Sequence, residues 1–125
     1  MEQEDLVTQQ VDQFVLQEID SVPHLEALLL LWNTRPKQWP PAEMAHALYI
    51  SAEETQPILQ DLQNRGLLTS NEGRFSYASN PERDELIGSV DRIYRREIVR
   101  IANVIHSKAS PAVRAFARAF RFKKD

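Results

Sequence analysis

Helix-start signals divide this chain more clearly than any other feature of its sequence. Ser21 and Ser51 each stand before a run of apolar residues at helical spacing, and Asn80 directly precedes Pro81. A Ser or Asn side chain at such a position accepts hydrogen bonds from the first unpaired amides, and Pro is tolerated in the first turn. Glu54 follows Ser51 by three residues, which completes a capping box. These signals predict helices that begin just after residues 21, 51 and 80.

Apolar periodicity extends this prediction over most of the chain. Leu25, Leu28, Leu29 and Trp32 recur at the 3.6-residue period of a buried helical face. Gly66 suits the left-handed end of a helix. The predicted helices cover residues 6–19, 22–33, 41–48, 51–65, 81–106 and 111–124.

Only one pair of strands is predicted. Short β-prone runs at 67–69 and 74–77 flank a turn that contains Asn71 and Gly73, two residue types that accept positive φ. Phe75 and Tyr77 share one face by the two-residue period of a strand. The fold class is therefore mainly α with one β-hairpin, an α+β arrangement. We expect an N-terminal helix over 1–20, a central unit over 21–78 and a helical extension over 79–125.

The element order between residues 21 and 78 resembles the winged helix-turn-helix domain of bacterial transcription regulators. The likeness is carried by residues 43–51, which read EMAHALYIS, and by residues 58–68, which read ILQDLQNRGLL. In such folds a small residue, here Ala45, lets the third helix cross closely over the second. Residues 21–31 and 114–121 also resemble segments of small bacterial winged-helix proteins that have no assigned activity.

The resemblance implies a DNA-binding regulator that reads DNA with residues 51–65 and uses residues 67–78 as the wing. Gln56 and Gln60 are candidates for contact with the major-groove edge of adenine. The other candidate DNA contacts are polar or basic residues in or near this unit: Ser51, Arg65, Arg74, Arg35 and Lys37.

The distribution of charge opposes this interpretation. The net charge is −3, residues 1–20 contain six acids and no Lys or Arg, and the segment 42–64 contains no Lys or Arg either. DNA affinity depends largely on the neutralisation of phosphates by cations. The alternative hypothesis is a winged-helix module that binds a protein partner and does not bind DNA through its acidic recognition helix.

The positive charge lies in the C-terminal part of the chain, which carries eleven basic and six acidic residues over 81–125. Four arginines, Arg92, Arg95, Arg96 and Arg100, either contact phosphates or pair with acids such as Glu97, Asp91 and those of the N-terminal helix. The terminal helices together are predicted to form a homodimer interface. Phe116 and Phe120 dock either on the body of the protein or on a partner or membrane surface.

Several functions are excluded or disfavoured. Without cysteine the chain has no disulfide and no thiolate metal site. Its three histidines are far apart in sequence, and only three glycines are present, so we predict no metal site, no phosphate loop, no cofactor and no catalysis. The longest apolar run, 27–32, is too short to cross a bilayer, and the acidic start is unlike a signal peptide. We expect a cytoplasmic protein.

Overall fold

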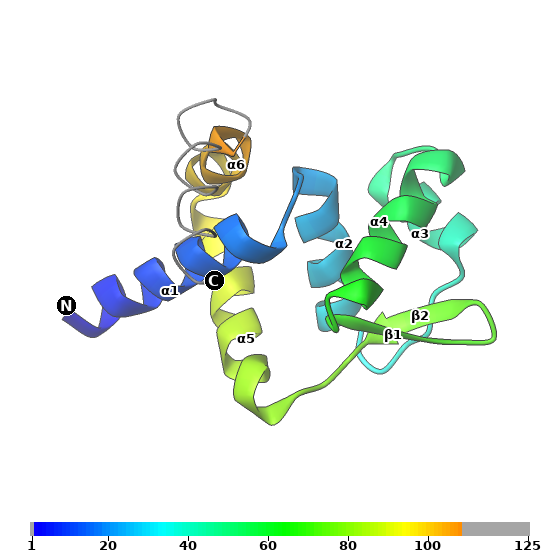
Figure 1. Ribbon diagram of the computed structural model, residues 1–125, viewed down its shortest axis with the longest axis horizontal. Coiled ribbons are helices and arrows are strands. Elements are labelled where there is room, and N and C mark those ends of the chain that lie inside the picture. The colour runs from blue at the N-terminus through cyan, green and yellow to red at the C-terminus, as the bar shows by residue number, and fades with distance from the viewer. Residues whose placement is uncertain (1, 109–125) are drawn as a thin grey trace, which may run out of the picture.

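The computed structural model describes residues 2–108 and contains six helices and one hairpin in that range. Their order is the one predicted for the winged-helix unit, with a helix before it and two helices after it (Figure 1). The elements are α1 (Glu2–Glu18), α2 (Val22–Asn33), α3 (Pro41–Leu48), α4 (Ala52–Asn64), β1 (Leu68–Asn71), β2 (Arg74–Tyr77), α5 (Pro81–Arg96) and α6 (Ile98–Ser107).

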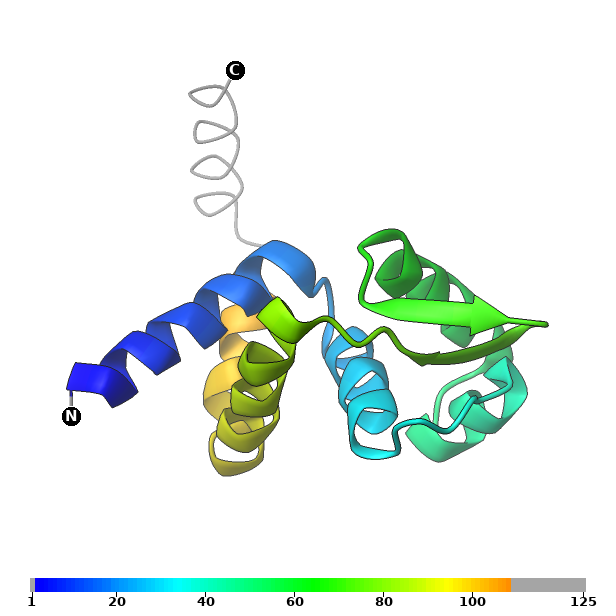
Figure 2. The same cartoon turned by 90° about the horizontal axis from the view of Figure 1, so that it is seen from below.

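The elements form two lobes. Helices α3 and α4 and the hairpin lie at one end of the molecule, and α1, α5 and α6 lie at the other (Figures 1 and 2). Helix α2 lies between them and packs on α3, α4, β2 and α5. We call the first group, together with α2, the winged-helix unit, and the second group the helical lobe. The winged-helix fold expected from the sequence is confirmed.

Each lobe buries the apolar faces of its helices. Helix α1 buries Val11, Phe14 and Val15 where it packs against α5 and α6, and Ile19, directly after the helix, is also buried. In the winged-helix unit the buried stripe of α4 is Thr55, Ile58, Leu59 and Leu62. One continuous apolar cluster includes residues of both lobes.

The predicted helix caps are present. Ser21 Oγ accepts a hydrogen bond from the His24 amide, and Ser51 Oγ accepts one from the Glu54 amide. Asn80 Oδ1 accepts from the Glu82 amide. Helix α4 begins directly after Ser51 and continues through Pro57, although this proline removes one backbone donor from the helix.

The turn between α3 and α4 is made by a residue that rarely makes such turns. Tyr49 takes the left-handed conformation, with φ 57° and ψ 38°, and its amide donates to α3 carbonyl oxygens. Left-handed backbone costs a residue with a Cβ about 1–2 kcal/mol. The Tyr49 side chain is 94% exposed, so packing does not offset this cost.

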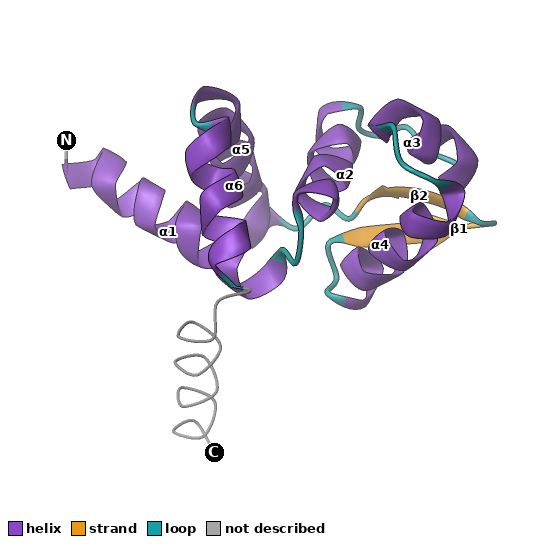
Figure 3. Ribbon diagram, turned by 90° about the horizontal axis from the view of Figure 1, so that it is seen from above, coloured by secondary structure: helices purple, strands orange, loops and turns teal. Residues whose placement is uncertain are grey.

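The hairpin is tighter than predicted (Figure 3). Asn71 belongs to β1 and pairs with Arg74, so the turn consists of Glu72 and Gly73, with φ 53° and 78°. Two consecutive positive φ values give the type I′ turn, whose twist matches that of the flanking strands. Glu72, rather than Asn71, therefore takes the left-handed position beside Gly73. Phe75 is buried on the predicted face of β2 and also pairs with Trp39, which extends the sheet by one residue.

The single helix predicted over 81–106 is wrong, because it is interrupted at Glu97. That residue has φ −134° and ψ 52° and separates α5 from α6. Neither Pro nor Gly stands at the break, so its cause is packing: the bend lets Ile101 and Ile105 of α6 become buried where α6 meets α1. Ile98, at the start of α6, is 53% exposed.

The last predicted helix, 111–124, lies outside the described residues, and so do Phe116 and Phe120. Within residues 2–108 no helix has the length and apolar character needed to cross a membrane.

Candidate nucleic-acid interface

The exposed face of α4 carries the polar residues that the sequence predicts for base contact. Gln56 and Gln60 are exposed and lie one helical turn apart. Gln60 Nε2 donates to Asn64 Oδ1 at 3.1 Å, which leaves its carbonyl oxygen available. Ser51 is exposed at the start of the same helix, where its hydroxyl is used as the cap.

The electrostatics of this face are acidic. Glu53 and Glu54 occupy the first turn of α4, where carboxylates interact favourably with the positive end of the helix dipole. They stabilise the helix and at the same time repel phosphates. Asp61 lies further along, with its side chain 48% exposed.

Arg74 lies at the tip of the wing. It directly follows the Glu72–Gly73 turn and is exposed. No ion pair found among the described residues includes it. Arg74 is thus a cation on the outer edge of the winged-helix unit.

Arg35 and Lys37 are held on aromatic rings in the loop between α2 and α3. The Arg35 guanidinium carbon lies 3.4 Å from the centroid of the Trp32 ring. Lys37 Nζ lies 3.8 Å from the Trp39 ring centroid and 2.8 Å from Glu43 Oε1. Stacking of this kind keeps a cation ordered while it stays exposed to solvent.

Arg65 points away from the exposed face of α4. Its guanidinium donates to the carbonyl oxygen of Gln17 at 3.0 Å and to Glu18 Oε2 at 3.2 Å, and it lies 3.4 Å from Asp20 Oδ2. These partners belong to the end of α1 and the residues after it. The structure thus places Arg65 as a tie between α4 and the helical lobe.

The four C-terminal arginines lie in the helical lobe, and two of them are paired. Arg95 pairs with Asp91 at 3.1 Å, and Arg100 binds both carboxylate oxygens of Asp12 on α1, at 3.0 and 2.9 Å. Arg100 Nε also donates to Glu97, and these hydrogen bonds raise the pKa of Arg100. Arg92 and Arg96 are exposed beside a shallow hollow at the start of α1.

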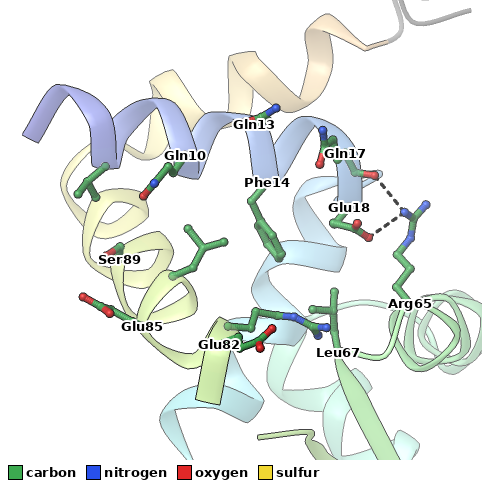
Figure 4. A pocket seen from close by; sticks show the side chains of 13 residues that line it. Gln10, Gln13, Phe14, Gln17, Glu18, Arg65, Leu67, Glu82, Glu85 and Ser89 are labelled. Carbon is green, nitrogen blue, oxygen red and sulfur yellow. Dashed lines mark hydrogen bonds and ion pairs between the residues drawn. The ribbon is translucent and has the colours of Figure 1, made fainter. Parts of the chain in front are cut away.

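A larger hollow of about 640 Å³ lies where the two lobes meet. Gln10, Gln13 and Gln17 of α1 line one side, and Glu82, Glu85 and Ser89 of α5 line the other (Figure 4). Arg65 closes the end next to the winged-helix unit, and Phe14 contributes apolar surface. The tie between the lobes is therefore also the wall of this hollow.

Sequence reasoning missed two polar clusters. In the first, Asp84 accepts hydrogen bonds from Tyr77 Oη at 2.6 Å, Ser79 Oγ at 2.7 Å and the Asn80 amide at 3.0 Å. These bonds, led by the one from the backbone, lower the pKa of Asp84 to about 2. Burial and the nearby carboxylate raise the pKa of Tyr77. The cluster fixes the end of the wing to the start of α5.

The second cluster is centred on His24, which is 9% exposed. Its Nδ1 lies 2.6 Å from Ser21 Oγ and its Nε2 lies 3.1 Å from Asp61 Oδ2. Asp20 completes a group whose ligand-type atoms all lie within 4.8 Å of one another. The four-residue spacing of Asp20 and His24 is visible in the sequence. Asp61 lies 37 residues after His24, so no local pattern could predict that it joins them.

No family model and no curated protein sequence matches this chain. Solved structures do match it. A MarR family protein of Mycobacterium tuberculosis, Rv2887, is 15% identical, with a TM-score of 0.54 over 98% of this chain and 88% of that one. MepR, a transcription regulator of the Staphylococcus aureus multidrug efflux pump MepA, is 15% identical, with a TM-score of 0.51 over 97% and 89%. A MarR family protein from Bacillus stearothermophilus is 18% identical, with a TM-score of 0.50 over 97% and 84%. The likeness establishes the fold, including helices on both sides of the winged-helix unit.

Proposed function

We propose that the protein is a non-catalytic, DNA-binding transcriptional regulator that inserts α4 into the major groove and places the wing against the backbone. The observation that carries this proposal is that exposed polar side chains on α4 and an exposed cation at the wing tip belong to the same winged-helix unit. Gln56 and Gln60 project from α4, and Arg74 stands at the wing tip. The fold shared with MepR, a solved structure described as a transcription regulator, supports the same conclusion.

Base contact and phosphate contact are divided between these elements. Glutamine can bind N6 and N7 of adenine with both ends of its amide, a contact worth about 1–3 kcal/mol of discrimination. Arg74 supplies positive charge where the hairpin tip meets the sugar–phosphate backbone. Arg35 and Lys37, ordered on their tryptophans, are the next nearest cations of the unit.

The small number of free cations has a measurable consequence. Each phosphate that a cation neutralises steepens the dependence of log K on log salt by about 0.9. Arg35 and Arg74 are the cations of the winged-helix unit that no ion pair among the described residues includes, and they therefore give a shallow slope of about 2 per protomer. Lys37, Arg65 and Arg100 do not add to it, because they are used in internal ion pairs.

We further propose that the protein acts as a homodimer through the helical lobe. Leu6, Ile98 and Val99 are between 53% and 73% exposed in this lobe, on the packed helices α1 and α6, and a second copy would cover them. The exposed Arg92 and Arg96 adjoin Glu4, and a second copy would supply further acids from its own first helix. Two recognition helices would then meet half-sites one helical turn of DNA apart.

The test starts from a pool of random-sequence fluorescent duplexes, enriched on the full chain and then titrated at 50 and 200 mM salt. Gln56→Ala and Gln60→Ala should each weaken the enriched site by roughly tenfold, whereas Gln9→Ala on α1 should have no effect. Arg74→Ala should weaken all sequences and lower the salt slope by about one.

Three results would count against the proposal: no binding at 50 mM salt, binding without salt dependence, or loss of binding in Arg92→Ala and Arg96→Ala but not in the α4 variants. Light scattering over a concentration series tests the dimer. A protein that stays monomeric at high micromolar concentration would remove it.

The acidic first turn of α4 favours one other function, a module that binds a basic protein segment. Glu53 and Glu54 lie on the exposed face with no Lys or Arg between residues 42 and 64. In that case Glu53→Gln with Glu54→Gln would abolish binding of a lysine-rich peptide. The same double variant would strengthen DNA binding if α4 reads DNA, because it removes repulsion from phosphates.

A further inference from the structure

The cluster around His24 has the composition of a transition-metal site. An imidazole nitrogen and two carboxylates are ligands that zinc accepts. Asp20 follows the end of α1, His24 is in the first turn of α2, and Asp61 is in the second half of α4. Three separate segments therefore bring ligand-type atoms to within 4.8 Å of one another.

One of the distances already suits a metal. Ligand atoms about 2.0–2.1 Å from a tetrahedral zinc ion lie roughly 3.3 Å apart, and His24 Nε2 lies 3.1 Å from Asp61 Oδ2. The third ligand lies within 4.8 Å of the other two, so it has to move by at most about 1.5 Å. Asp20 can do so because its side chain is 51% exposed.

A hydrogen bond at the second ring nitrogen, Nδ1, orients the imidazole of His24. Metal binding requires an unprotonated Nε2, and the tautomer that provides it carries hydrogen on Nδ1. Ser21 Oγ lies 2.6 Å from Nδ1 and can accept that hydrogen. A hydrogen bond to the second ring nitrogen is the usual support of a metal-bound histidine. The His24 side chain is 11% exposed, so it has little freedom to turn away.

We propose that Asp20, His24 and Asp61 bind one divalent transition-metal ion of the zinc class, with water in the remaining position. The resident positive charges compete with it. Arg65 Nη2 lies 3.4 Å from one oxygen of Asp20, and Lys108 Nζ lies 3.9 Å from the other. The metal displaces these cations from Asp20, so its binding weakens the contact between Arg65 and the end of α1.

The experiment is calorimetric titration of the untagged full chain with zinc chloride in a buffer that does not chelate metals. One ion should bind per chain. Asp61→Asn and His24→Gln should each weaken binding by roughly tenfold or more. His46→Gln and His106→Gln are matched controls, because both residues are exposed and remote in sequence from the cluster, and they should bind zinc as the parent does. Magnesium, which prefers oxygen ligands and keeps its water shell, should bind far more weakly.

Arg65→Gln provides a test in the opposite direction. Removal of the competing cation should tighten zinc binding by about two- to fivefold, the equivalent of one exposed ion pair. The proposal is overturned if the parent takes up no zinc, if Asp61→Asn binds as tightly as the parent, or if Arg65→Gln binds more weakly. Far-ultraviolet circular dichroism checks folding. Should His24→Gln unfold, Asp61→Asn and Asp20→Asn decide the matter, since both amides replace half-exposed carboxylates.

Discussion

The buried and exposed sides of the winged-helix unit are built from different chemistry. On the buried side Leu59 fills the core, Tyr77 is bonded to Asp84, and Arg65 is paired with acids at the end of α1. On the exposed side Gln56 and Arg74 have no such ties among the described residues. The basic residues predicted to contact DNA thus have two different roles: Arg74 is exposed at the wing tip, whereas Arg65 holds the two lobes together. Substitutions on the buried side should change stability, and those on the exposed side should change binding.

The largest effect is expected at the centre of the buried side. Leu59→Ala removes a side chain that is 0% exposed and should lower the free energy of unfolding by about 3 kcal/mol, from lost burial and the remaining cavity. Urea denaturation followed by circular dichroism measures it. The adjacent Gln60→Ala on the exposed side is the control and should change stability by less than about 0.5 kcal/mol. Equal losses in the two variants would contradict the contrast between the sides.

The next effect concerns the bond between the wing and α5. Tyr77→Phe removes the hydroxyl that donates to Asp84 at 2.6 Å and should cost about 1.5 kcal/mol at pH 7, because the acceptor is ionised. The pKa of Asp84 is lowered to about 2, so the stability that depends on its ionised form is present above its ordinary pKa of about 4 and is lost as pH falls through 2. Urea denaturation at pH 7, 4 and 2.5 should show the difference between parent and variant shrinking at the lowest pH. A difference that grows on acidification would show that the bond is not made to an ionised carboxylate.

The ion pairs of Arg65, which connect the two lobes, are expected to contribute less to the free energy of unfolding. Arg65→Gln should lower the free energy of unfolding by about 0.5–1 kcal/mol at low salt, since the Arg65 side chain is 32% exposed and solvent screens the pairs. At 0.5 M salt the loss should be smaller, because exposed ion pairs are screened. Denaturation at two salt concentrations measures both values. A loss that is independent of salt would mean that Arg65 acts through packing of its stem.

The smallest effect is expected on the exposed side. Tyr49→Gly relieves the left-handed backbone of the turn before α4 but adds freedom to the unfolded chain, and we expect a net gain of about 0.5 kcal/mol. Tyr49→Ala keeps a Cβ and is the matched control, with no gain. Thermal unfolding followed by circular dichroism compares the two. If the glycine variant is the less stable one, the tyrosine ring has an interaction that exposure does not reveal.

Local signals account for most of the fold that could be predicted. The caps at Ser21, Ser51 and Asn80 act within three residues of themselves, so the sequence alone contains the interaction. The break at Glu97 could not be predicted in this way, because it depends on where α1 lies. The turn at Glu72 was missed because Asn71 is the better turn former in isolation, and the strand register overrides that preference.

The candidate interface shows the same limit. The exposure of Gln56 and Gln60 follows from helical periodicity and was predicted from it. The orientation of Arg65 was not, since its partners Glu18 and Asp20 lie about 45 residues earlier in the chain. Local pattern fixes which side of a helix a residue occupies, and tertiary contact fixes what a long cationic side chain reaches.

Gly88 gives the junction between the lobes a specific property. A Cβ at this position on α5 would lie 3.4 Å from Cζ2 of Trp32, the ring that stacks on Arg35 and meets Tyr77 edge-on at 5.0 Å. A methyl group would just touch the indole, and any larger side chain would act as a wedge. The size of residue 88 therefore limits how closely α5 can approach α2. A larger side chain there would push the two helices apart and so change the angle between the two lobes.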